Sequence, residues 1–208
     1  MRVTVFTLAT LLLCLDVSWL AAQQERPGVS SPRSANPDSP ERRTPDIKHQ
    51  SRLDQLFERL AASRDETEAE SIAQQITRIW SRSGSDTTDL LMQRVQQAMQ
   101  QKDAVLALDL LDSILALKPD WAEAYNRRAT VHFQNQDFDA AMRDLRQTLA
   151  LEPRQFQALS GVGMIFQRGG NKKQALAAFR AALSLNPHIK GIKQAAETLS
   201  TGQDGQSL

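Results

Sequence analysis

Histidines and carboxylates are the groups in this 208-residue sequence that could carry acid–base chemistry or bind a metal. His49, His132 and His188 are far apart along the chain and share no local constellation with one another. The sequence contains no HExxH, GxSxG, P-loop or dinucleotide-binding glycine pattern. We therefore expect no catalytic residues, no metal site and no cofactor.

Two pairs of carboxylates and one pair of glycines could be mistaken for parts of a site. Asp109 and Asp112, and likewise Asp137 and Asp139, fall at predicted helix starts or on predicted exposed faces. At such positions carboxylates cap helices or are simply solvated. The Gly-x-Gly at 161–163 lies inside a predicted helix, where a small residue permits close packing. None of these pairs predicts an enzyme.

Composition excludes further classes of function. Residues 51–208 carry 19 basic and 19 acidic side chains, so the basic excess expected of a nucleic-acid-binding protein is absent. The single cysteine, Cys14, lies in an apolar N-terminal stretch. Removal of that stretch would leave no thiol for a disulfide, a nucleophile or a zinc site.

Residues 88–187 are organised as a sequence repeat. Pro119, Pro153 and Pro187 are 34 residues apart, and the other five prolines all lie between residues 27 and 45. A fixed period of this length is typical of a helical repeat array. The segment 122–153 reads as two helices, and its neighbours on both sides align with it at offsets of 34 residues.

Small and large residues alternate consistently in the aligned units. Ala107, Ala141 and Ala175 share one position, and four residues later the chain has Leu111, Leu145 and Phe179. Short side chains allow two antiparallel helices to approach closely, and larger ones fill the space around the contact. In the first helix of each unit, Val95, Ala129 and Gly163 share a position of the same kind.

This pattern resembles the tetratricopeptide repeat (TPR) family. The match is closest in residues 156–187, at Leu159, Gly163, Phe166, Gly170, Ala175, Phe179, Ala182 and Pro187. Units 88–121 and 122–155 match less fully, with Lys102 and Gln136 where the family usually has glycine. His132 stands where an aromatic residue is usual, so we interpret it as a packing residue rather than a catalytic one.

The resemblance implies a right-handed all-α solenoid whose concave groove binds a peptide or a partner segment. The groove positions of the family correspond to Met92, Gln96, Met99, Asn126, Arg127, Thr130, Phe133, Gln134, Met164, Gln167 and Arg168. The Met and Phe side chains suit adaptable apolar recognition, or alternatively pack on a neighbouring helix. Met92 and Gln96 replace the Lys and Asn of the chaperone-type carboxylate clamp, so a receptor for C-terminal carboxylates is not expected.

The N-terminal part predicts export. Arg2 precedes a 13-residue apolar run, Val3–Leu15, which is too short to span a bilayer but suits a signal peptide over residues 1–22. Cleavage after Ala22 would leave Gln23 first. The alternatives are a buried helix and a lipoprotein anchored through Cys14. Residues 23–50 are rich in proline, serine and charge and predict a disordered linker.

Two further elements flank the repeats. Apolar spacing in residues 51–83 predicts a helical hairpin, either a degenerate repeat or a cap, with Asp65 and Glu68 opening its second helix. Residues 188–200 predict a C-terminal capping helix, and residues 201–208 a disordered tail. Solenoids need such caps because the last repeat would otherwise expose its apolar face.

The sequence thus predicts a non-catalytic protein-interaction scaffold of the cell envelope, most simply the bacterial periplasm. Secretion and lipid anchoring are the alternative locations. The partner would be a protein or peptide, with no nucleic acid and no membrane span after signal cleavage, and the chain would be a monomer or part of a small assembly. The alternative function is a structural subunit whose apolar face is permanently buried in an envelope complex.

Overall fold

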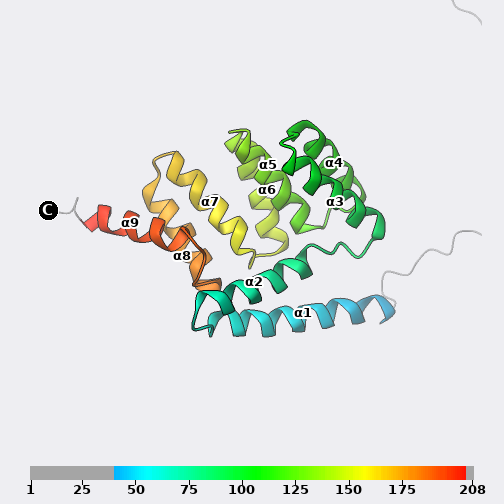
Figure 1. The fold of residues 1–208 in the computed structure, drawn as a ribbon, viewed down its shortest axis with the longest axis horizontal. Coiled ribbons are helices and arrows are strands. Elements are labelled where there is room, and N and C mark those ends of the chain that lie inside the picture. The colour runs from blue at the N-terminus through cyan, green and yellow to red at the C-terminus, as the bar shows by residue number, and fades with distance from the viewer. Residues whose placement is uncertain (1–39, 205–208) are drawn as a thin grey trace, which may run out of the picture. The chain divides into compact units, whose positions relative to one another are not determined.

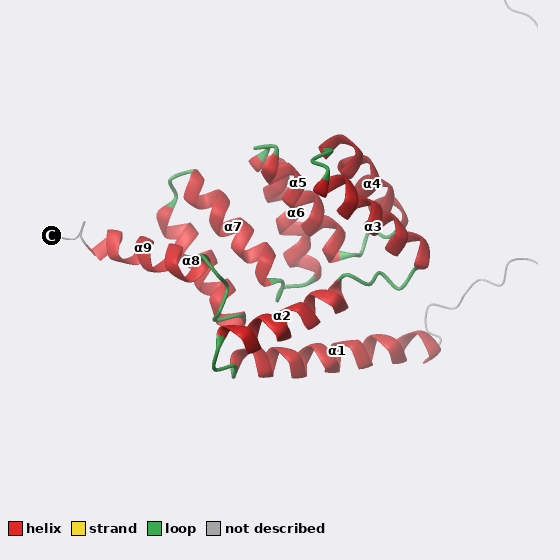
Figure 2. Cartoon of the chain, in the orientation of Figure 1, coloured by secondary structure: helices red, strands yellow, loops and turns green. Residues whose placement is uncertain are grey.

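The computed structural model describes the backbone of residues 40–204 and the side chains of residues 50–201. The predicted signal peptide, most of the predicted linker and residues 205–208 lie outside this range. The described part is helical throughout, and Figures 1 and 2 show the order of its helices. They are α1 (Pro40–Ala61), α2 (Glu66–Trp80), α3 (Asp86–Gln100), α4 (Ala104–Leu117), α5 (Ala122–Gln134), α6 (Phe138–Leu151), α7 (Phe156–Arg168), α8 (Lys172–Leu185) and α9 (Ile192–Asp204).

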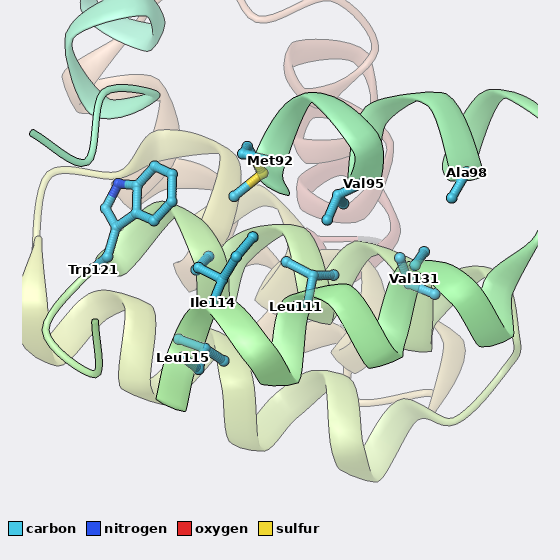
Figure 3. Packing of buried hydrophobic residues seen from close by; sticks show 10 residues of the cluster. Met92, Val95, Ala98, Leu111, Ile114, Leu115, Trp121 and Val131 are labelled. Atoms are coloured by element: carbon cyan, nitrogen blue, oxygen red, sulfur yellow. The ribbon is translucent and has the colours of Figure 1, made fainter. Parts of the chain in front are cut away.

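Three helical hairpins form the repeat array, as the 34-residue period predicts. The pairs are α3–α4, α5–α6 and α7–α8, and each second helix packs against the first helix of the next pair. Ala107, Ala141 and Ala175 are completely buried at the aligned small position. Figure 3 shows the interior of the first hairpin, where Val95 and Leu111 face each other between α3 and α4. The predicted all-α repeat solenoid is confirmed.

The turn inside each hairpin has the same geometry in all three repeats. Lys102, Gln136 and Gly170 all adopt positive φ angles, of 58°, 63° and 74°. Only glycine adopts this conformation without a steric cost. The turn is therefore strained at Lys102 and Gln136 in the first two repeats and unstrained at Gly170 in the third. The Asp103 and Asp137 side chains then cap the following helices, each accepting from a backbone N–H at 3.0 Å.

The third hairpin shows how the interior volume is conserved. A Cβ atom on Gly163 would overlap the ring of Phe179, which is completely buried. In the second repeat the same two positions hold Ala129 and Leu145. The larger aromatic ring is thus accommodated by the loss of one methyl group on the facing helix, as close packing requires.

The N-terminal hairpin exists but does not stack on the array. Helices α1 and α2 lie across the turns that connect one repeat to the next, along one side of the repeats (Figure 1). The Ser63 carbonyl lies 3.3 Å from the His188 ring, beyond the third repeat, whereas Trp80 reaches the turn before the second repeat. The hairpin is therefore neither a preceding repeat nor a cap on the first one.

Aromatic packing explains why the hairpin takes this course. Phe57, Trp80 and Phe156 form a cluster with ring centroids 5.6–6.5 Å apart. Arg154, in the turn between α6 and α7, lies over the Phe57 ring at 4.8 Å and pairs with Asp54 at 2.6 Å. Phe156 and Arg154 lie at the turn between the second and third repeats. The apolar side of the hairpin therefore packs against the repeat turns and not against the end of the stack.

Two predicted boundaries differ from the structure. Helix α1 begins at Pro40, although residues up to 50 were predicted as linker. Proline at the first helical position costs no hydrogen bond, so Pro40 is compatible with the start of a helix. Helix α9 runs from Ile192 to Asp204, because Gly191 adopts a φ of 74° and delays its start beyond the predicted residue 188.

The predicted start of α2 agrees with the structure. Asp65 is the N-cap, and its carboxylate accepts from the backbone N–H of Glu68 at 2.8 Å. Within residues 40–204, no helix combines the length and the apolar character needed to cross a bilayer.

Candidate functional site

A hollow of about 530 Å³ lies between the second and third repeats. Its two long walls are α5 and α7, the first helices of their hairpins. Helix α2 closes one part of it through Thr77, and the turn leading into α9 closes another. Its lining consists of Thr77, Glu123, Asn126, Arg127, Ala129, Thr130, Phe133, Leu145, Phe156, Gln157, Ser160, Gly161, Met164, Asn186, Ile189, Lys190 and Ile192.

Apolar side chains from the two walls offer the contact surface. Phe133 on α5 is half-buried, and Met164 on α7 has 37% of its surface exposed. Ile189 and Ile192 add branched side chains from the direction of α9. A flexible thioether beside an aromatic ring can adapt to apolar groups of different shapes.

A buried polar network forms the floor of this groove. The carboxylate of Glu123, which is 2% exposed, accepts from Arg127 Nε at 2.6 Å and from Gln155 Nε2 at 2.6 Å. Asn126 Nδ2 donates to the same carboxylate at 3.2 Å. Burial of a carboxylate is costly unless it is paired and hydrogen-bonded, and here both conditions hold.

This network changes what Arg127 can do. Its charge is already balanced by Glu123, so a partner carboxylate would not meet an isolated cation. Lys190, which also lines the groove, pairs with Glu66 at 3.1 Å, and this hydrogen bond raises the pKa of Lys190. The groove is therefore better suited to apolar side chains than to a negatively charged chain end.

Arg168 lies at the edge of the same surface. Its guanidinium is 5.7 Å from the ring centre of Phe133 and 5.4 Å from that of Phe138. The two rings meet edge-to-face with centroids 5.4 Å apart. Arg168 thus orients Phe133, which lines the hollow, without lining it itself.

Ten of the eleven predicted groove residues fall into three sets. Five of them are brought together in the hollow: Asn126, Arg127, Thr130, Phe133 and Met164. Met99 and Gln134 line a separate hollow of about 430 Å³ at the tips of the first two repeats. Gln96, Gln167 and Arg168 are exposed outside both hollows.

Met92 differs from its predicted position. It is 3% exposed and packs with Val95, Ile114 and Trp121 in the interior of the first repeat (Figure 3). Spacing in the repeat alone does not distinguish a groove position from a buried one. In this chain Met92 instead packs in one buried cluster with Trp121, from the turn before α5.

Several lining residues were missed by sequence reasoning. Thr77, Ile189, Lys190 and Ile192 come from elements outside the aligned repeats. They reach the groove only because α2 crosses the repeat turns and α9 packs on the third repeat. Glu123 could have been noticed, since an acidic residue followed by Asn126 and Arg127 at helical spacing predicts a local network.

His132, Asp112 and Asp137, which the sequence offers as acid–base groups, make structural contacts. His132 Nδ1 and Nε2 lie 3.9 Å from carboxylate oxygens of Asp137 and Asp144, respectively. Asp137 caps α6, and Asp112 accepts from Arg128 Nη1 at 2.6 Å. No group of three or more His, Cys, Asp or Glu residues between 50 and 201 is arranged to hold a metal. The side chain of His49 lies outside this range.

Comparison with known proteins places these features in a family. A profile described as "Tetratricopeptide repeat" matches residues 126–188. A TPR repeat-containing protein of Rhizobium etli is 45% identical over 136 residues, which are 65% of this chain and 67% of that protein. The small glutamine-rich tetratricopeptide repeat-containing protein 2 of Saccharomyces cerevisiae is 26% identical over 61% of this chain and 36% of its own length.

Solved structures agree at the level of the fold. The Arabidopsis OM64 TPR domain superposes with a TM-score of 0.52 at 23% identity, covering 55% of this chain and 94% of the domain. The first TPR domain of Spaghetti (RPAP3), bound to the HSP90 peptide SRMEEVD, superposes with a TM-score of 0.53 at 18% identity. The superposition covers 56% of this chain and 93% of that domain.

TPR domains mediate protein–protein interaction, some of them by binding peptides, and they are generally non-catalytic. The repeat period, the buried alanines and the similarity to the Rhizobium etli protein all lead to the same assignment. This chain belongs to the tetratricopeptide repeat family.

Proposed function

We propose that this protein binds a segment of a partner protein in the groove between α5 and α7. The observation that carries this proposal is the exposure of Phe133 and Met164 in a hollow of about 530 Å³. A hollow of this size accommodates a few side chains of an extended or helical segment.

The groove predicts the chemistry of the segment. Its exposed surface is mainly apolar, and its cations Arg127 and Lys190 are paired with Glu123 and Glu66. A bulky aliphatic or aromatic side chain of the partner would therefore lie between Phe133 and Met164. The RPAP3 domain binds a peptide, which supports the proposal that this fold can bind a segment of a partner. The groove of this chain differs in being mainly apolar, with its cations paired to carboxylates.

Site-specific photo-cross-linking tests this proposal. A photoreactive residue at Thr130, in the groove, should cross-link one protein in the producing cell. The same residue at Leu151, on α6 and outside the groove, should not. Cross-linking from both positions to the same extent would contradict a groove-centred interaction.

Substitution supplies a second, matched test. Met164 and Leu151 are equally exposed, at 37%, but only Met164 lines the groove. Met164→Glu should reduce partner binding by roughly tenfold or more, because it places a charge in the apolar contact. Leu151→Glu should leave binding unchanged. Circular dichroism should show the same helical content in both variants.

We also propose that the protein acts in the cell envelope after export. The sequence of residues 1–22, with Arg2 before the apolar run Val3–Leu15, supports this proposal. Intact-mass measurement of the protein from its own cell should find Gln23 as the first residue. Recovery of a chain that still begins at Met1, from the interior of the cell, would contradict export.

A further inference from the structure

The outer face of α3 and α4 is unusually apolar for an exposed surface. Leu90, Val105, Leu106 and Leu117 are 54%, 72%, 44% and 62% exposed. They account for four of the six large apolar side chains that are exposed between residues 50 and 201. We call the face formed by these four residues and Leu110 the leading face.

The repeat alignment shows what this face is built to contact. Leu90 occupies the position of Ala124 and Ala158, which are completely buried. Ala124 packs with Leu111 and Leu115 of the preceding repeat. Leu90 therefore lies on the surface by which later repeats stack against the repeat before them.

The second helix of the hairpin contributes to the same surface. Leu106 and Leu110 align with Ala140 and Asp144, which are both buried in the second repeat. Leu106, Leu110 and Leu117 lie on one stripe of α4, because they are separated by four and seven residues. A stripe of this kind continues the interface between repeats.

The chain has no element of its own to cover this face within residues 40–204. Helices α1 and α2 lie across the repeat turns, where Phe57, Trp80 and Phe156 hold them. The opposite end of the array, in contrast, is capped by α9. The exposed side of α9 is polar and carries Lys193, Gln194, Glu197 and Thr198.

We propose that the leading face binds the leading face of a second copy of this chain. The polar exposed side of α9 offers no apolar partner, so head-to-tail stacking would leave Leu90 and Leu106 against charges. Contact between two leading faces buries apolar surface on both sides and closes as a two-fold dimer. The face also carries exposed Arg94 and Asp109, so charges of opposite sign can meet across the two-fold axis.

Molar mass measured across a concentration series tests this proposal, with the protein purified as it accumulates in the cell. The wild-type chain should reach twice its monomer mass. The double substitution Leu106→Glu and Leu117→Glu should give a monomer with unchanged circular dichroism. Leu151→Glu, at the position of Leu117 in the second repeat, should still dimerise.

Disulfide trapping gives an independent readout that needs no disruptive substitution. In a Cys14→Ser background, Ser113→Cys introduces a thiol in the middle of the leading stripe, and oxidation should give a covalent dimer. Gln147→Cys, at the equivalent exposed position of the second repeat, should remain monomeric. A wild-type chain that stays monomeric would overturn the proposal, whether the face is bare or covered by residues 1–39. A dimer that survives the double substitution would also overturn it.

Discussion

Trp121 Nε1 donates a hydrogen bond to the backbone carbonyl of Trp80 at 2.9 Å, and both residues are buried. Trp80 is the last residue of α2, where carbonyls have no partner within the helix. Trp121 stands in the turn before α5. The indole of Trp121 thus provides a hydrogen-bond donor for a carbonyl at the C-terminal end of α2. The same bond joins the N-terminal hairpin to the repeat array.

Trp121→Phe should lower the free energy of unfolding by about 1–3 kcal/mol, because it leaves the buried Trp80 carbonyl unpaired. The matched variant is Trp80→Phe, which removes a similar volume but keeps that carbonyl and loses only a 3.3 Å bond to Glu152. Chemical denaturation should show the larger loss for Trp121→Phe. Equal losses would mean that packing and not the hydrogen bond holds the hairpin.

Gly163→Ala should destabilise the third repeat by about 1–3 kcal/mol, because the new methyl group overlaps the ring of Phe179. The loss should exceed the gain of about 1 kcal/mol from the better helix propensity of alanine. Adding Phe179→Leu reproduces the Ala129–Leu145 pair of the second repeat. Melting curves should therefore show partial rescue in the double variant, and the absence of rescue would contradict the volume argument.

Gln136→Gly should stabilise the protein by roughly 0.5–1 kcal/mol, since it removes the cost of a positive φ angle at a residue with a Cβ atom. Gly170→Ala, at the equivalent turn, should destabilise it by a similar amount. Thermal unfolding of the two variants should shift in opposite directions. Shifts of the same sign would show that the turn conformation is not the dominant effect.

Arg128 connects three helices by ion pairs. Its Nε and Nη2 atoms bond to Asp144 at 2.8 and 2.7 Å, and Nη1 bonds to Asp112 at 2.6 Å. The hydrogen bonds to Asp144 and then Asp112 raise the pKa of Arg128 above its ordinary value, against the opposing effect of burial. These contacts therefore favour the charged form of Arg128.

Arg128→Met should cost about 3 kcal/mol, because it leaves the buried carboxylate of Asp144 without its partner. The double variant Arg128→Met, Asp144→Leu should recover much of this loss, since apolar residues, Leu110 and Ala178, occupy the aligned position in the other repeats. Urea denaturation measures both variants. A double variant that is no more stable than the single one would contradict this interpretation.

The repeat array could be predicted because its determinants are local and periodic. Ala107, Ala141 and Ala175 recur at the same offset, and each hairpin packs mainly on its immediate neighbours. The groove was predicted only in part, because some of its lining residues come from elements outside the periodic repeats. Phe133 and Met164 lie on repeat helices and could be placed by spacing, whereas Thr77 and Ile189 could not.

The sequence by itself determined the helices, their pairing and the family. A 34-residue period specifies which residues meet within a hairpin, since helix contacts follow the 3.6-residue turn. Only the tertiary structure decided where the N-terminal hairpin lies, because non-periodic contacts among Phe57, Trp80, Trp121 and Phe156 outweigh stacking on the first repeat. That placement closes the groove with Thr77 and leaves Leu90 and Leu106 exposed on the leading face.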